Sequence, residues 1–139
     1  MGPLRAAGLE ALAHTAGPDT PAGPTAGYVD PAAPFYQACD VIVSTSEYES
    51  FGNSVCEAMA SGLAVAGYRG GAAQEVVGDA GLIVETGDLS GLTAAVKRVI
   101  GDPCLRRDLE RRARERVTTH FDAARSVLEL CRVHESVCR

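Results

Sequence analysis

The sequence predicts an α/β fold, with a parallel sheet of about four strands and helices on its faces. Three short apolar runs, at residues 41–43, 63–66 and 82–84, follow one another at intervals of about twenty residues. Each run is unbroken rather than alternating, which is typical of strands buried on both faces. The intervals are long enough for the helical crossovers that parallel neighbours require.

The segment before these strands is predicted to contain little regular structure. Residues 1–26 are rich in Ala, Gly, Pro and Thr and are expected to form a poorly ordered lead-in. Within it, leucines at positions 4, 9 and 12 can line one side of a short helix, which Gly8 weakens. A weak strand is expected at residues 27–29, so the domain proper covers residues 27–139.

One crossover helix is well marked, at residues 53–61. Its spacing places Val55, Ala58, Met59 and Gly62 on one side and Ser54, Glu57 and Ser61 on the other. The apolar side is expected to face the sheet.

The C-terminal third is predicted to be helical. Asp88 is a plausible N-cap for a helix with an apolar stripe that runs to Ile100. Asp102 and Pro103 give a cap and a proline at the first position of a second helix. The stripe of this second helix comprises Leu105, Leu109, Ala113 and Val117.

Two further patterns mark this helical region. Six arginines lie between Arg106 and Arg116, alternate with acids, and favour a solvated helix face over a phosphate-binding patch. A last helix, at about residues 123–137, aligns Val127, Leu130, Cys131 and Val137.

Composition excludes several classes of protein. The chain of 139 residues is one domain's worth of sequence, and its aromatic content of 5% predicts a core of small aliphatic residues. A net charge of -5 argues against nucleic acid as the main partner. No apolar run approaches the roughly 20 residues of a transmembrane helix. Five cysteines without metal-ligand spacing predict no metal site and a reduced, cytoplasmic setting.

The segment at residues 46–57 is the strongest candidate for a ligand site. It follows the strand at 41–43 and opens a helix, at the edge of a parallel sheet where ligands bind. Gly52 allows close approach to the backbone, and the amides of residues 53–55 can receive a diphosphate. Carboxylates such as Glu49 and Glu57 suit a vicinal diol, because they accept two hydrogen bonds.

This segment closely resembles the acidic motif of retaining glycosyltransferases with the two-domain GT-B architecture, the glycosyl transferases group 1 family. Seven residues separate Glu49 and Glu57, within Glu-Ser-Phe-Gly at 49–52 and Glu-Ala-Met-Ala-Ser-Gly at 57–62. The match includes residues 36–41, 70–77 and 81–84, and runs from about residue 27 to 121. Thr45 and Ala64 depart from the family, which usually has proline there. The implied fold is an incomplete, Rossmann-like C-terminal domain.

The resemblance implies a role for each residue of the motif. Glu57 would hold the ribose hydroxyls of a UDP- or GDP-sugar, and Glu49 would be the catalytic residue, whose carboxylate meets the transferred sugar. The other implied donor-binding residues are Phe51, Gly52, Asn53, Ser54, Gly70 and Gly71. Neither a cofactor nor a metal is implied.

Each residue also has a structural explanation. Ser54 and Glu57 form the Ser-x-x-Glu pattern of a capping box, which would make Glu57 purely structural. Glu49 alone is more often an exposed loop acid, and Gly70 and Gly71 alone are a turn between a strand and a helix. Only the surrounding match favours a binding site.

Three hypotheses for function follow. The preferred one is the donor-binding part of a truncated glycosyltransferase, inactive alone, because the acceptor domain and the basic pair that grips the donor phosphates would lie upstream. The second is a non-catalytic nucleotide-sugar-binding subunit or sensor that needs a partner chain. The third is a degenerate remnant that binds nothing.

Overall fold

A computed structural model describes residues 31–138 and confirms the α/β fold. Its strands are β1 (Val41–Ser44), β2 (Ala64–Tyr68) and β3 (Gly81–Val84), and its helices are α2 (Ala33–Gln37), α3 (Asn53–Ala60), α4 (Ala73–Val77), α5 (Leu89–Gly101), α6 (Pro103–His120) and α7 (Ala123–Val137). The helix expected at residues 4–12, the strand at 27–29 and the boundary after residue 26 lie outside the described residues.

The described strands form one parallel sheet in the order β1-β2-β3. Val41 of β1 is opposite Ala64 of β2, and Val65 of β2 is opposite Gly81 of β3. All five residues of β2 are buried, but β1 and β3 are only partly buried. The expectation that all three strands are buried on both faces is therefore wrong for β1 and β3, because these are the outer strands of the described sheet.

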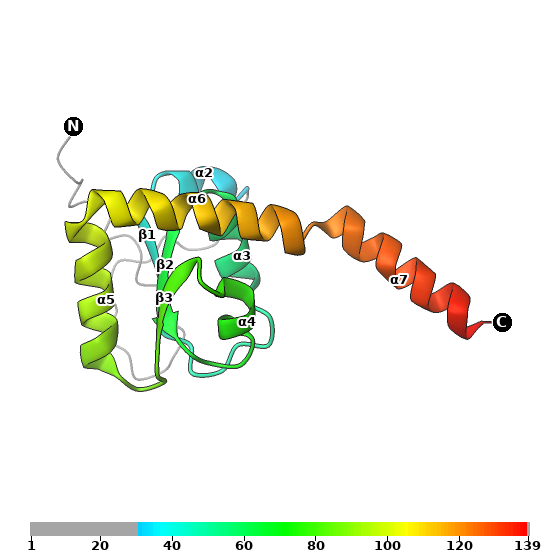
Figure 1. The fold of residues 1–139 in the computed structure, drawn as a ribbon, viewed down its shortest axis with the longest axis horizontal. Coiled ribbons are helices and arrows are strands. Elements are labelled where there is room, and N and C mark those ends of the chain that lie inside the picture. The colour runs from blue at the N-terminus through cyan, green and yellow to red at the C-terminus, as the bar shows by residue number, and fades with distance from the viewer. Residues whose placement is uncertain (1–30, 139) are drawn as a thin grey trace.

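Helices cover both faces of the sheet (Figure 1). On one face, Ala66 and Tyr68 of β2 pack against α5. On the other, Val65 packs against α3, α4 and α6. The largest fully buried side chains are Met59, Leu109 and several valines, which confirms a core of small residues. The predicted stripe of α3 is buried at Val55, Ala58 and Met59.

The two predicted aspartate caps are present. The Asp88 carboxylate accepts a hydrogen bond of 2.9 Å from the Gly91 amide, which with the Ser90 hydroxyl lowers the pKa of Asp88. Asp102 accepts bonds of 3.0 Å from the amides of Cys104 and Leu105. These caps fix the starts of α5 and α6.

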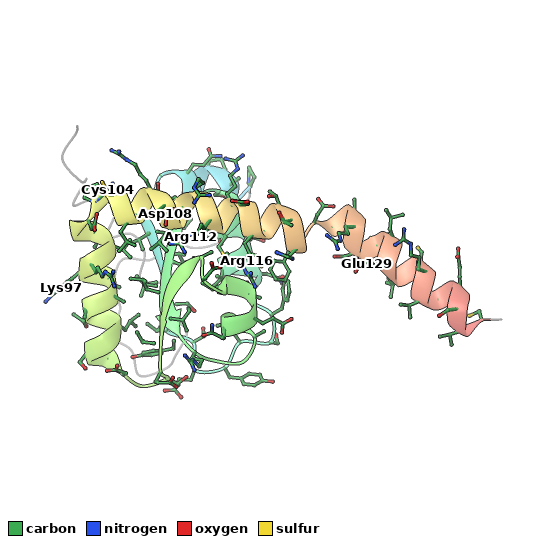
Figure 2. The ribbon with its side chains drawn as sticks, in the orientation of Figure 1. Lys97, Cys104, Asp108, Arg112, Arg116 and Glu129 are labelled. Atoms are coloured by element: carbon green, nitrogen blue, oxygen red, sulfur yellow. The ribbon has the colours of Figure 1, made fainter. Side chains whose placement is uncertain are left out.

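The prediction that the arginines of α6 form a solvated face is wrong for two of them, Arg112 and Arg116. Arg116 Nε donates to the Val76 carbonyl at 2.8 Å, and its Nη2 donates to the Glu75 carbonyl at 2.6 Å. Arg112 Nη1 donates to the Asp79 carbonyl at 3.0 Å. Figure 2 shows Arg112 and Arg116 on the side of α6 that faces α4. Because α4 is short, its last carbonyls need such partners.

The helix α7 is formed as predicted, but none of its residues is buried. Its apolar residues, including Val127, Leu130 and Val137, are 59–77% exposed. Figure 1 shows α7 extending away from the sheet and the helices around it. Among the helices that the structure describes, none is both long and apolar enough to cross a bilayer.

Replacing Arg116 by methionine is expected to lower the free energy of unfolding by about 1–2 kcal/mol, because two carbonyls of α4 lose a charged donor. Arg114→Met is the matched control, since the exposed Arg114 side chain makes no such bond within residues 31–138; its effect should stay within about 0.5 kcal/mol. Urea unfolding measures both. Equal losses would show that the bonds from Arg116 to α4 do not stabilise the fold.

Candidate functional site

The loops that follow β1 and β2 meet at the carboxyl end of the sheet. A Cβ atom on Gly70 would lie 2.5 Å from the Glu47 carbonyl oxygen, and one on Gly71 would overlap the Glu49 carbonyl oxygen. The Ala72 amide donates a hydrogen bond of 2.8 Å to that Glu49 oxygen. Only glycines allow the two backbones to approach this closely. Gly70 and Gly71 therefore hold the loop that carries Glu49, while their predicted contact with a donor stays a prediction.

Gly71→Ala should destabilise the protein more than Gly62→Ala. Both positions have a positive φ, 54° at Gly71 and 87° at Gly62, so each alanine costs about 1–2 kcal/mol in backbone strain. A Cβ at Gly62 meets nothing within 4 Å, whereas at Gly71 it displaces the Glu49 backbone. Overpacking adds about 1–3 kcal/mol there. Equal unfolding midpoints in urea would contradict the packing of these two loops.

The chain bends at Gly52 and α3 begins directly after it. Gly52 is buried, has φ of 90°, and occupies the N-cap position without a side chain to cap the first turn. Ser54 is the second residue of α3 and does not occupy its N-cap position. The capping-box explanation of Ser54 and Glu57 is therefore wrong, because that motif needs the serine at the N-cap. Within residues 31–138 no side chain caps this helix start, so its backbone amides can receive hydrogen bonds from a ligand.

Glu49 and Glu57 lie on either side of this bend. Glu49 is half-buried, with its Cγ 3.2 Å from where a Cβ on Gly52 would stand. Glu57 is exposed on α3, and its Oε2 accepts a hydrogen bond of 3.3 Å from the Tyr36 hydroxyl. Within residues 31–138, neither carboxylate takes part in an ion pair. Both keep acceptor positions for the hydroxyls of a ligand.

The remaining predicted residues are distributed around the bend. Asn53 and Ser54 are exposed in the first turn of α3. The Phe51 ring packs edge-on against Phe121 at the end of α6, with a centroid distance of 5.7 Å. Arg69, the basic residue nearest the motif in sequence, has its Nη1 3.2 Å from Glu85 Oε1 in an exposed ion pair.

Tyr36 was missed as a residue of the site. It comes from α2, 21 residues before Glu57, and the sequence carries no local signal for this contact. Burial raises the pKa of the Tyr36 hydroxyl, and the charge and hydrogen bond of Glu57 raise it further. Burial also raises the pKa of the neighbouring Cys56 thiol, with a smaller effect from Glu57.

Glu57→Gln should lower the pKa of Tyr36, because the substitution removes a negative charge that raises this pKa. Burial, which is the larger cause, still keeps the pKa above its usual value. Glu49→Gln is the control and should leave that pKa unchanged. The measurement is a pH titration of the tyrosine Cζ resonances by NMR, with the Tyr36 signal assigned by its loss in Tyr36→Phe. An unchanged titration in Glu57→Gln would contradict the Tyr36 contact.

Other features of the described chain offer no competing polar site. Residues 31–138 contain no group of three His, Cys, Asp or Glu side chains arranged to hold a metal ion. An open groove of about 390 Å³ runs beside β3, lined by Gly81–Val84, Ala94, Ala95 and Arg98. Its lining includes neither Glu49 nor Glu57.

The comparisons with known proteins establish the family. The family model for glycosyl transferases group 1 matches residues 2–102. The lipopolysaccharide core biosynthesis glycosyltransferase LpsE of Rhizobium meliloti is 35% identical over 98 residues, which are 69% of this chain and 29% of LpsE. The chain therefore belongs to the group 1 glycosyltransferases.

Solved structures agree with this assignment. Sucrose-phosphate synthase from Thermosynechococcus elongatus superposes with a TM-score of 0.76 at 32% identity, over 81% of this chain and 29% of that enzyme. HepE from Anabaena, solved in complex with UDP-glucose, gives a TM-score of 0.73 at 24% identity, over 81% of this chain and 32% of HepE. These neighbours are GT-B glycosyltransferases, so the described parallel sheet and its helices correspond to part of a GT-B fold. The chain spans about a third or less of their length.

Proposed function

We propose that the chain binds a nucleotide-sugar, a UDP- or GDP-sugar, at the bend around Gly52 and supplies the donor side of a retaining sugar transfer. The observation that supports this most directly is the pair of acids, Glu49 and Glu57, beside a helix start whose N-cap is a glycine; neither acid forms an ion pair with another residue of 31–138. The family, and the complex of HepE with UDP-glucose, support the choice of ligand class.

Each part of the donor has a matching group in this proposal. Glu57 accepts hydrogen bonds from the ribose hydroxyls, and the amides of Asn53 and Ser54 meet the diphosphate at the positive end of α3. Glu49 and the backbone at Phe51 and Gly52 contact the sugar. Gly70 and Gly71 lie at the same edge of the sheet, where they hold the Glu49 loop, and we propose that they also contact the donor there.

In the reaction, the bond from the anomeric carbon to the diphosphate oxygen breaks and its electron pair leaves with the diphosphate. A bond to the acceptor oxygen forms on the same face of the sugar, and the proton of the acceptor hydroxyl passes to the departing diphosphate oxygen. Positive charge develops on the sugar ring during this exchange, and the Glu49 carboxylate is placed to stabilise it. The chemistry therefore relies on positioning and charge.

Transfer by this chain alone is not expected. Arg69, the basic residue nearest the motif in sequence, forms an exposed ion pair with Glu85, and we do not assign it the role of the basic pair that grips the donor phosphates in the family. We propose that an acceptor-binding part, either in a longer protein or in a partner chain, completes the enzyme. The five cysteines of the chain are free thiols, which supports our proposal of a reduced, cytoplasmic setting for the protein.

The alternative, a non-catalytic nucleotide-sugar-binding subunit, is favoured by one observation. The helix α7 exposes five large apolar residues and has no buried residue, and so offers an apolar surface to another chain. A partner that co-purifies and restores sugar transfer would favour this alternative over a fragment of a single enzyme.

Glu57→Ala is expected to weaken the binding of the donor at least about tenfold, because a charged acceptor of hydrogen bonds is lost. Isothermal titration calorimetry with UDP-glucose and, separately, GDP-mannose measures this affinity. Glu135→Ala, which removes the same charge from α7, is the control and should bind as the unchanged chain does. Equal affinity of Glu57→Ala would contradict the proposal, and absence of heat with every nucleotide-sugar would favour the remnant that binds nothing.

A further inference from the structure

The contact between Tyr36 and Glu57 joins two separate elements. Tyr36 lies on α2, before β1, whereas Glu57 lies on α3, after it. The hydroxyl donates to Oε2 of Glu57 at 3.3 Å. Of the polar contacts that the structure describes for the Glu57 side chain, this is the one hydrogen bond. Among the described residues, Tyr36 is therefore the one whose hydrogen bond can restrict the orientation of the Glu57 carboxylate.

The Tyr36 ring also packs against another side chain. It is half-buried and packs edge-on against Phe35, with ring centroids 5.8 Å apart and an interplanar angle of 67°. Tyrosine has only two side-chain torsions, so a packed ring brings its hydroxyl to a defined position. The packed ring and the exposed acid are therefore in hydrogen-bond contact, and the ring is the less exposed of the two.

An exposed glutamate benefits from a hydrogen bond that restricts its orientation before a ligand binds. An exposed glutamate samples many rotamers, and ordering it on binding is costly in entropy. One hydroxyl donor occupies a single acceptor position of Oε2, so the carboxylate keeps three of its roughly four acceptor positions. Two of these suffice for the adjacent hydroxyls of a ribose. A held carboxylate then accepts both hydroxyls with less loss of freedom.

We infer that Tyr36 is a positioning residue for recognition of the ribose, acting through Glu57, so that the site prefers nucleotides with both ribose hydroxyls. This inference rests on the proposed function, because it assumes that Glu57 contacts the ribose. Tyr36 itself touches neither the sugar nor the diphosphate in this arrangement. Its effect is confined to the ribose end of the donor.

The test compares UDP with 2′-deoxy-UDP by calorimetry, in the unchanged chain, Tyr36→Phe, Glu57→Ala and the double variant. Tyr36→Phe should weaken the binding of UDP about three- to tenfold and that of 2′-deoxy-UDP less than about twofold. In the Glu57→Ala background, Tyr36→Phe should cost nothing further, because the group it acts through is gone.

Tyr68→Phe is the matched control. It removes a hydroxyl from a buried ring on the α5 face of β2, away from Glu57, and should leave the affinity for UDP unchanged. Unchanged thermal unfolding of Tyr36→Phe would show that any loss of affinity comes from the missing hydroxyl rather than from the fold.

The outcomes separate this inference from the proposed function. If Glu57→Ala weakens UDP but Tyr36→Phe does not, the positioning role is overturned while the proposed function stands. Equal losses for UDP and 2′-deoxy-UDP in Tyr36→Phe, or additive losses in the double variant, would also overturn it, because the effect would then bypass Glu57. If Glu57→Ala binds UDP normally, both the proposed function and this inference fail.

Discussion

The close approach of two backbone segments at the carboxyl end of the sheet is the constraint on which the candidate site depends. The loop after β2 can lie against the loop after β1 because Gly70 and Gly71 have no side chains to separate the carbonyls of Glu47 and Glu49 from them. The Ala72 amide then bonds to Glu49 and closes the contact. This contact fixes the backbone of one acid of the pair.

The second acid is positioned by the helix that begins at the bend. Gly52 adopts a left-handed conformation, which lets the chain turn into α3 with Val55 and Met59 directed into the core. The buried stripe fixes the rotation of α3, and that rotation places Glu57 on the exposed side. The core and the site are thus two faces of one short helix, so the sequence of α3 must satisfy both.

Local signals in the sequence were sufficient for much of the fold. The Asp88 and Asp102 caps and the buried sides of α3 and α6 depend on residues within a few turns of each other. The caps are present as predicted, and the predicted sides are buried except at Leu105, which is partly buried, and Gly62, which lies beyond the end of α3. Burial of β1 and β3 was overestimated, because a run of apolar residues does not reveal whether a strand has a neighbour on each side. The exposure of α7 was not predictable either, because an apolar stripe on a helix does not reveal whether another element packs against it.

The site was predictable in its residues but not in its contacts. The spacing of Glu49 and Glu57, with Gly52 between them, identified the bend, whereas the capping box was wrong because Gly52, not Ser54, is the N-cap of α3. Tyr36 and the arginine contacts of α6 span 21 to 41 residues, and pairings at such separations follow from the fold alone. Sequence patterns cannot supply them.

The central claim is that an activated sugar binds where these loops meet. The most direct measurement is a titration of the ¹⁵N-labelled chain with UDP-glucose and with GDP-mannose, followed by amide NMR shifts. The account predicts that the largest shifts fall on the amides of residues 49–57 and of Gly70 and Gly71. Shifts concentrated along the groove beside β3, at residues 81–84 and Arg98, would contradict it.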